Sequence, residues 1–298
     1  MDPIALGCVA LAAVLHAGWN ILLKGADDPL RTAALGIAAS SAVIVPVVAV
    51  GWFVLGQPSI PLNAWGIGIL SGGVEVLYFA FLAAAFRRGD LSVVYPLARG
   101  SAPLLAIAIG ITLLGEQLSP GAWLGVGLLL AGLLFVQRPW RLLRSAASAN
   151  DRTAAGFALL TGATIATYSA LDTVGVSLTP VWVYAGILWP TCMVGLALLV
   201  FARRRVAGGR FAPPESPLDR RTAVVGGFLT FSAYGLVLVA LSRAPLAIVA
   251  PLRESAIVLT SLWGVVRLGE APGRRERSIR IGGSLLVLVG AAVLAVAR

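Results

Sequence analysis

The chain of 298 residues is 58% hydrophobic and 12% charged, with a mean hydropathy of +0.91. Soluble domains average about 25% charged residues, so the composition excludes an ordinary soluble protein and indicates a polytopic membrane protein. The formal net charge of +10 comes from basic residues in short loops beside apolar stretches, which argues against nucleic-acid binding. Both cysteines, Cys8 and Cys192, lie in apolar runs and are too few to predict a disulfide framework, and we expect neither a metal nor a cofactor.

Ten apolar stretches are long enough to cross a membrane, and we therefore predict an all-α integral membrane fold. Helices are expected because backbone polar groups within the bilayer must be paired internally, which an open sheet cannot do. In chain order, the predicted transmembrane helices are 3–24, 33–55, 64–86, 91–114, 120–137, 154–176, 181–202, 222–242, 245–268 and 279–297.

One segment of the sequence occurs twice. The first copy reads RGDLSVVYPLARGSAPLLAIAIGITLLGE from Arg88, and the second reads RAPLAIVAPLRESAIVLTSLWGVVRLGE from Arg243. The offset between the copies is 155 residues at their beginning and 154 at their end, where Glu116 corresponds to Glu270. A period near half the chain length indicates two fused copies of one unit.

We expect the first repeat to span residues 1–146 and the second to span 154–298, joined by the basic linker 138–153. Each repeat has five predicted helices. Because five is odd, the second repeat would enter the membrane upside down, which gives ten transmembrane helices in two inverted five-helix repeats. Transporters commonly have this plan, with their site at the interface of the repeats. The alternative is an old duplication retained for packing alone.

The basic residues are distributed unevenly between the two sides of the predicted membrane. The five odd-numbered loops hold 19 of them, whereas the even-numbered loops and both termini hold only Arg243 and Arg298. Short basic loops stay in the cytoplasm. We therefore predict a bacterial-type inner (plasma) membrane protein with cytoplasmic odd-numbered loops and both termini outside.

Several motifs resemble those of the EamA-like family of the drug/metabolite transporter superfamily. They are Leu114-Gly115-Glu116 and Leu268-Gly269-Glu270 at the repeat ends, and His16-Ala-Gly-Trp19-Asn20 before Lys24 in the first span. The resemblance covers essentially the whole chain and implies ten spans in two five-span repeats. Many ten-span relatives are drawn with cytoplasmic termini, whereas the charges of this sequence predict the reverse.

Charged residues within the predicted spans are the leading candidates for a functional site. Arg99 lies in the fourth span, and Arg253 and Glu254 lie in the ninth. The repeat matches Arg99 with Glu254, so we predict an ion pair between them; Arg253 is expected to pair with Glu75 or Asp172. In the functional interpretation, an arginine binds a carboxylate or phosphate of a substrate. In the alternative, the pair only fixes helix packing.

Four further polar residues are candidates for proton coupling or substrate binding. Glu75 and Asp172 are potential proton carriers, although Asp172 could instead be solvated near the membrane surface. His16 and Asn20 share a helical face with Trp19, because they are spaced at i, i+3 and i+4. This face suits a substrate cavity with His16 as a proton relay; a histidine that only supports packing is the alternative.

Three aromatic residues and two glutamates at the ends of spans complete the candidates. Tyr78, Tyr168 and Trp189 are expected to line the cavity, with an interfacial position as the alternative. Glu116 and Glu270 follow the ends of their spans, and we interpret them as structural loop residues.

We predict a secondary transporter that moves a small metabolite, amino acid or organic anion-like, by alternating access between two inverted halves. Proton coupling or exchange would drive it, because the sequence lacks the GxxxxGK[ST] pattern of phosphate-binding loops. A flippase for a phosphate-bearing lipid carrier is the alternative. With one histidine and no nucleophile–base motif, an integral membrane enzyme acting on lipids is disfavoured. The expected partners are a small-molecule substrate and the lipid bilayer, and a homodimer is left open.

Overall fold

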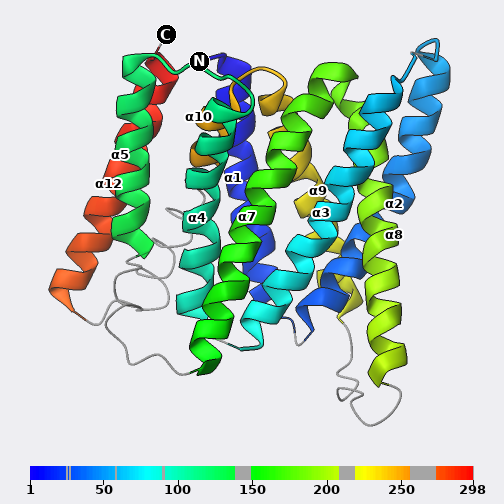
Figure 1. Ribbon diagram of the computed structural model, residues 1–298, viewed down its shortest axis with the longest axis horizontal. Coiled ribbons are helices and arrows are strands. Elements are labelled where there is room, and N and C mark those ends of the chain that lie inside the picture. The colour runs from blue at the N-terminus through cyan, green and yellow to red at the C-terminus, as the bar shows by residue number, and fades with distance from the viewer. Residues whose placement is uncertain are drawn as a thin grey trace.

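The computed structural model describes residues 1–24, 26, 28–57, 59–88, 91–137, 149–207, 219–255 and 273–297. In this part of the chain all the regular structure is helical, and the helices form a single bundle (Figure 1). They are α1 (Pro3–Lys24), α2 (Pro29–Val54), α3 (Leu62–Phe86), α4 (Leu91–Thr112), α5 (Pro120–Gln137), α7 (Ala149–Leu178), α8 (Val181–Ala207), α9 (Arg220–Leu241), α10 (Leu246–Arg253) and α12 (Arg274–Val296).

The helices confirm the all-helical membrane fold expected from the apolar stretches. Six helices of the described chain are long and apolar enough to cross a membrane, and three shorter apolar stretches lie in α1, α4 and α5. The bounds of α1 and α5 agree with the predicted spans to the residue. Large apolar side chains such as Phe53, Leu62 and Leu198 are exposed on the outside of the bundle, as contact with lipid requires.

Two expected boundaries differ from the structure. The linker was placed at 138–153, but α7 already begins at Ala149, because nothing in that polar stretch breaks a helix. The ninth span was expected as one helix over 245–268, whereas α10 ends at Arg253 and the chain turns at Glu254 and Ser255. The remainder of that span lies outside the described residues.

Helix starts are fixed by local signals in the sequence. Asp28 caps α2 by accepting a hydrogen bond from the backbone of Arg31 at 3.1 Å. Asp219 caps α9 in the same way through Arg221 and Thr222. A carboxylate at this position satisfies backbone N–H groups that have no partner within the helix.

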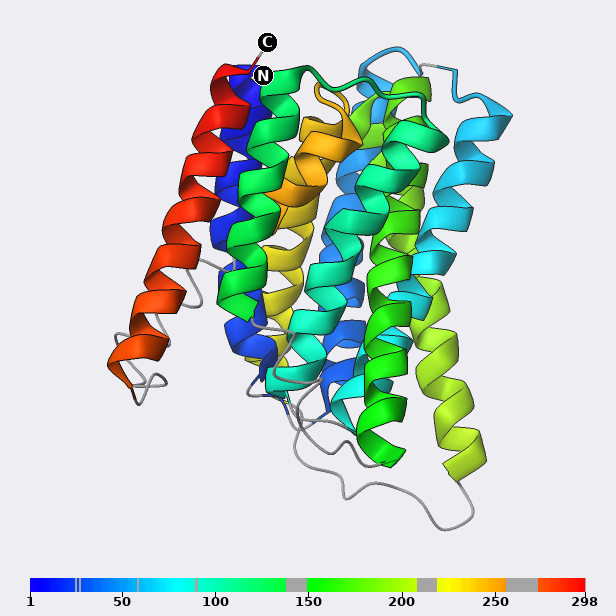
Figure 2. The ribbon, with the colours of Figure 1, turned by 60° about the vertical axis from the view of Figure 1, so that its left-hand side comes forward.

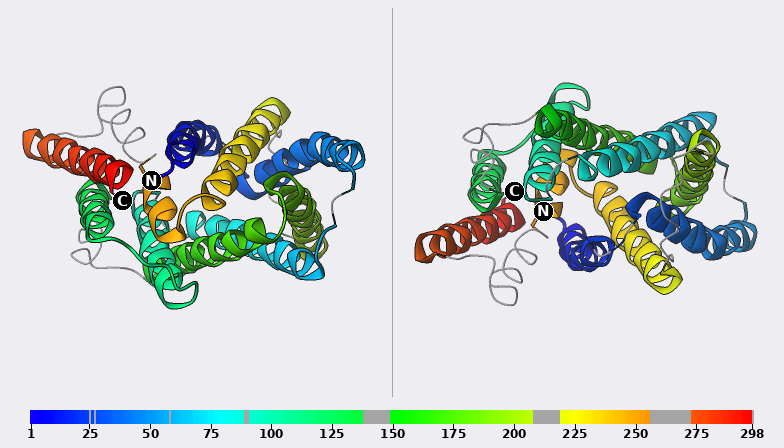
Figure 3. Two further views of the ribbon diagram at one scale, coloured as in Figure 1. Left: turned by 90° about the horizontal axis from the view of Figure 1, so that it is seen from above. Right: turned by 90° about the horizontal axis from the view of Figure 1, so that it is seen from below.

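The most extensive helix contacts join the first half of the chain to the second. In particular, α1 packs on α9, α3 on α7 and α8, α2 on α8 and α9, α4 on α7 and α10, and α5 on α12. The views along the bundle show this interleaving (Figure 3). If α1 to α5 are matched in order with α7, α8, α9, α10 and α12, exchanging the halves converts the α3–α7 contact into the α9–α1 contact. The α2–α9 contact likewise becomes the α8–α3 contact.

The first helix of each half begins at a different end of the bundle. Both termini lie at one end, where α1 begins, whereas α7 begins at the opposite end (Figure 1). At one edge of the bundle, α5 and α12 lie side by side (Figure 2). Between α2 and α9, a Cβ atom on Gly227 would overlap the backbone of Gly36, so the close crossing of these helices requires glycine.

Candidate functional site

Three charged side chains meet inside the bundle, where α4 and α10 pack together. Arg99 of α4 forms an ion pair with Glu254, with Nη1 and Oε1 3.1 Å apart. Arg253 of α10 approaches the same carboxylate oxygen, with its Nε at 3.5 Å, and donates to Ser169 of α7 at 3.4 Å. All three charged residues are at least 93% buried. We call Arg99, Arg253 and Glu254 the ionic centre.

The ionic centre contains the Arg99–Glu254 pair that the sequence repeat predicts. The expected partner of Arg253 was wrong, because its ion-pair partner in the described chain is Glu254 rather than Glu75 or Asp172. Sequence position alone did not reveal this partner, since consecutive residues of a continuous helix point in directions about 100° apart. The helix ends between them, and the turn brings their side chains together.

Asp172 lies at a junction of four helices and is completely buried. Its Oδ1 atom accepts hydrogen bonds from Ser71 of α3 at 2.5 Å and from Tyr184 of α8 at 2.7 Å. Its Oδ2 atom accepts a bond from the hydroxyl of Tyr234 on α9. Full burial excludes the alternative in which Asp172 is solvated near the membrane surface. We call Asp172 and these three hydroxyl donors the Asp172 junction.

Glu75 is one helical turn beyond Ser71 on α3 and is 93% buried. The thiol of Cys192 on α8 is its hydrogen-bond partner, and the charges of Asp172 and Arg253 act on it. Two carboxyl groups are thus held close together in different surroundings. Three hydroxyl groups surround the carboxyl group of Asp172, whereas a thiol, which is a weak donor, faces that of Glu75.

The predicted polar face of α1 divides into separate environments. His16 is near enough to the ionic centre for the charges of Arg99 and Arg253 to act on it. Trp19 is 96% buried, and its ring packs on Gly226 of α9. Trp19 therefore contributes to helix packing, and the side chain of Asn20 lies outside the described residues.

Aromatic rings form a connected cluster beside the Asp172 junction. Ring centroids are 6.1 Å apart for Tyr78 and Tyr168, 5.6 Å for Tyr168 and Tyr234, and 5.8 Å for Trp189 and Tyr234. The ring of Trp189 also meets Phe231 at 4.9 Å. Because Tyr168 and Trp189 are more than 90% buried, the interfacial alternative is wrong for both.

Several residues of this region were not anticipated from the sequence. Ser71 could have been found, since it lies four residues before Glu75 and so on the same helical face. Tyr184, Tyr234 and Cys192 gave no such signal, because only the tertiary packing of α8 and α9 brings them to the carboxyl groups. Gly175 permits the approach of Tyr184, whose ring occupies the space that a Cβ would take.

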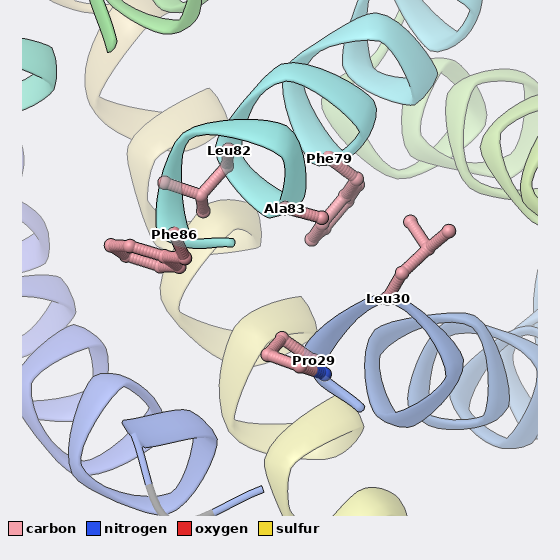
Figure 4. A pocket seen from close by; sticks show the side chains of 6 residues that line it. All are labelled: Pro29, Leu30, Phe79, Leu82, Ala83 and Phe86. Carbon is pink, nitrogen blue, oxygen red and sulfur yellow. The ribbon is translucent and has the colours of Figure 1, made fainter. Parts of the chain in front are cut away.

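A small surface pocket lies elsewhere, between the first turn of α2 and the last turns of α3 (Figure 4). Its lining is apolar throughout, and no charged side chain enters it. It therefore does not contain the ionic centre or the Asp172 junction, both of which are closely packed. The lining residues are Pro29, Leu30, Phe79, Leu82, Ala83 and Phe86.

The structure also places one of the two loop glutamates. The carboxylate of Glu116 accepts hydrogen bonds from the backbone N–H groups of Leu246 and Ala247 at the start of α10. Glu270 lies outside the described residues.

Comparison with known proteins supports the assignment of the first half of the chain. The spermidine export proteins MdtI of Salmonella paratyphi B and Salmonella newport are 40% identical over 70 residues, which are 24% of this chain and 64% of theirs. The match thus spans less than two thirds of the length of these relatives. A protein of known crystal structure has the same fold, with a TM-score of 0.72 at 21% identity over 97% of this chain and 95% of the other. Residues 3–138, which contain α1 to α5, match the EamA-like transporter family, so the resemblance seen in the sequence motifs is confirmed for this half.

Proposed function

We propose that this protein is a secondary transporter that moves a small metabolite across the membrane by alternating access between two inverted halves. The ionic centre is the observation that carries this proposal. Its side chains come from both halves, and burying charges costs several kcal/mol for each ion unless they are paired. Because ionisable side chains within a membrane are costly, those that are present commonly mark the pathway of a substrate or an ion.

The inverted repeat is supported by two features of the fold. Exchanging the halves converts the α3–α7 contact into the α9–α1 contact and the α2–α9 contact into the α8–α3 contact, and α1 and α7 start at opposite ends of the bundle. Transporters built in this way place their site at the interface of the repeats and open it to each side in turn. The orientation that follows from the basic loops, with both termini outside the cytoplasm of a bacterial-type cell, belongs to the same proposal.

The ionic centre suits a substrate that carries a carboxylate or phosphate group. Such a group can replace Glu254 on the guanidinium group of Arg99, which offers a planar pair of donors. The displaced carboxylate is then available for an amine, so an amino acid fits both charges. The MdtI relatives are named for the export of spermidine, a cationic amine, and such a substrate would use only the carboxyl groups.

Glu75 and Asp172 are the proposed proton-coupling residues. They lie beside the ionic centre, where the charge of Arg253 acts on both of them. A proton that binds to either carboxyl group changes the charge balance around Arg253. Substrate binding and proton release can therefore be linked through this arginine, with His16 as a further group within electrostatic reach.

Counterflow in proteoliposomes tests the proposal. Vesicles loaded with a mixed metabolite pool would contain the wild type, Arg99→Ala, Glu254→Gln or the matched control Arg243→Ala, which removes an arginine from an exposed ion pair. We expect the wild type and Arg243→Ala to accumulate a defined metabolite and the other two to fail. Equal accumulation by all four proteins would show that the ionic centre only supports helix packing and takes no part in transport. Accumulation of no soluble compound would contradict metabolite transport and favour the lipid-carrier alternative.

A further inference from the structure

The carboxylate of Glu116 caps α10, although more than a hundred residues separate them in the sequence. Its Oε1 atom accepts the backbone N–H of Leu246 at 2.6 Å, and its Oε2 atom accepts that of Ala247 at 2.8 Å. Pro245, at the N-cap position, makes no side-chain capping bond. Leu246 and Ala247 are fully buried, so Glu116 satisfies two donors that would otherwise be buried without partners.

Two glycines place this carboxylate. Gly115 has a φ of +68°, the left-handed conformation that commonly follows the end of a helix, and it turns the chain back after α4. The backbone N–H of Glu116 then donates to the carbonyl of Gly110 at 2.9 Å. A Cβ on Gly110 would overlap the carboxylate of Glu116, which therefore lies directly against the backbone of α4.

As a result, α4 and the segment that follows it hold α10 at both ends. Glu116 binds the beginning of α10, and Arg99 binds Glu254 directly after its end. The eight residues of α10 span only about 12 Å at 1.5 Å per residue. Such a short helix cannot shift along α4 unless one of these two attachments opens.

We propose that Glu116 is a positioning residue that latches α10 to α4 and so places Arg253 and Glu254 in the site. The attachment lies at the end of the bundle where both termini are found (Figure 1). When a substrate replaces Glu254 on Arg99, Glu116 still attaches the beginning of α10, which also packs directly on α4. The release of Glu116 then opens this end of the transporter. This inference rests on the proposed transport function, but its first step, the latch itself, can be tested without it.

Glu116→Gln is the sharpest variant, because it keeps the volume of the side chain. The amide can accept one backbone N–H through its oxygen, but its NH₂ group cannot accept the second. Gln117→Ala is the matched control, since Gln117 is the next residue and is exposed. The measurement is hydrogen–deuterium exchange of the full chain in nanodiscs, followed by mass spectrometry of peptides that cover α10, α2 and α9.

We expect Glu116→Gln to accelerate exchange in the first turn of α10 by roughly 3- to 30-fold, the effect of losing a helix cap. Exchange in α2 and α9 should stay at the wild-type rate, and Gln117→Ala should resemble the wild type throughout. Unchanged exchange in α10 would overturn the proposal. An equal acceleration in all three helices would also overturn it, because that result indicates general destabilisation.

The release step is tested by adding a metabolite that the wild type accumulates in counterflow. In the wild type we expect the metabolite to accelerate exchange in the first turn of α10. In Glu116→Gln this turn should already exchange fast without the metabolite, and adding the metabolite should raise its rate little further. Unchanged wild-type exchange in the presence of a transported metabolite would contradict the latch. If the wild type transports nothing, the proposed function fails, and the exchange rates without metabolite still decide whether Glu116 holds α10.

Discussion

The ionic centre and the Asp172 junction are neighbouring buried sites that stabilise their charges differently. In the ionic centre two guanidinium groups share one carboxylate, so charge balances charge. At the Asp172 junction, three hydroxyl groups from three other helices surround one carboxyl group. An ion pair can be exchanged for a charged substrate, whereas the hydroxyl groups cannot be replaced without separating the helices. We therefore expect the ionic centre to bind substrate and the hydrogen bonds of the Asp172 junction to hold the bundle together.

The largest expected effect is the loss of the shared carboxylate. Glu254→Gln leaves Arg99 and Arg253 buried together without their anion, which should destabilise the protein by about 3–5 kcal/mol. Arg99→Gln should cost less, because Glu254 keeps Arg253 as a partner at 3.5 Å. The free energy of unfolding, measured by steric trapping in bicelles, checks this order.

The double variant Arg99→Met with Glu254→Met is the control for this prediction. This variant removes Arg99 together with the shared carboxylate, so only Arg253 loses its anion, whereas Glu254→Gln takes the anion from both arginines. We expect the double variant to be more stable than Glu254→Gln and inactive in counterflow. A larger loss of stability in Arg99→Gln than in Glu254→Gln would show that the two arginines do not share one carboxylate.

Asp172→Asn should produce the next largest effect. The amide oxygen can accept part of the three hydrogen bonds, but the NH₂ group faces a hydroxyl donor, which should cost about 1–3 kcal/mol. Tyr184→Phe removes a single donor and should cost less. Transport should also fall, because Asp172 is a proposed proton-coupling residue. If thermal stability instead stays at the wild-type level, the hydrogen bonds of Asp172 do not hold the bundle together, and the comparison between the two sites would be wrong.

Gly175→Ala tests the packing beneath the Asp172 junction. The added methyl group would overlap the ring of Tyr184 and push its hydroxyl away from Asp172, at a cost of about 2 kcal/mol. Gly156→Ala on the same helix meets no atom within 4 Å and should be neutral or stabilising by up to about 1 kcal/mol. Opposite signs for the two variants in thermal unfolding support this account. Equal effects would contradict it.

The smallest effect concerns a surface ion pair outside the membrane-spanning helices. The backbone N–H of Ile4 and the side chain of Arg243 lower the pKa of Asp2 from its usual value of 3.8. A carboxylate with a lowered pKa stabilises the fold above its unfolded pKa and loses this contribution as the pH falls through its folded value. Asp2→Asn should therefore be slightly less stable than the wild type at pH 7 and equal to it in strong acid. A difference that persists in acid would exclude Asp2 as the cause.

Much of the fold follows from the sequence because apolar length and loop charge are local properties. Apart from the ninth, the expected spans correspond to helices, and the offset of 155 identified Arg99 and Glu254 as partners. The early end of α10 was not predicted, since Pro251 precedes it in a segment that is apolar on both sides. Hydropathy measures whether a segment can lie in a membrane, and it does not show where a helix turns within it.

The residues around the carboxyl groups were harder to predict. Asp172 was a candidate from its charge alone, but the hydroxyl groups that surround it come from α3, α8 and α9. Serine and tyrosine are common in membrane helices, so only the helix packing distinguishes Tyr234 from other tyrosines of the chain. The same holds for Glu116, whose partners on α10 become visible only when the two halves of the chain are folded together.

The interleaving of the two halves has a consequence for biosynthesis. Arg99 enters the membrane 155 residues before its partner Glu254 has been synthesised. At about 5–20 residues per second, this interval lasts roughly 10–30 s. During that time α1 and α3 also lack their main packing partners, α9 and α7. The nascent first half must therefore remain in the membrane without the Glu254 carboxylate and without most of its helix contacts until the second half is made.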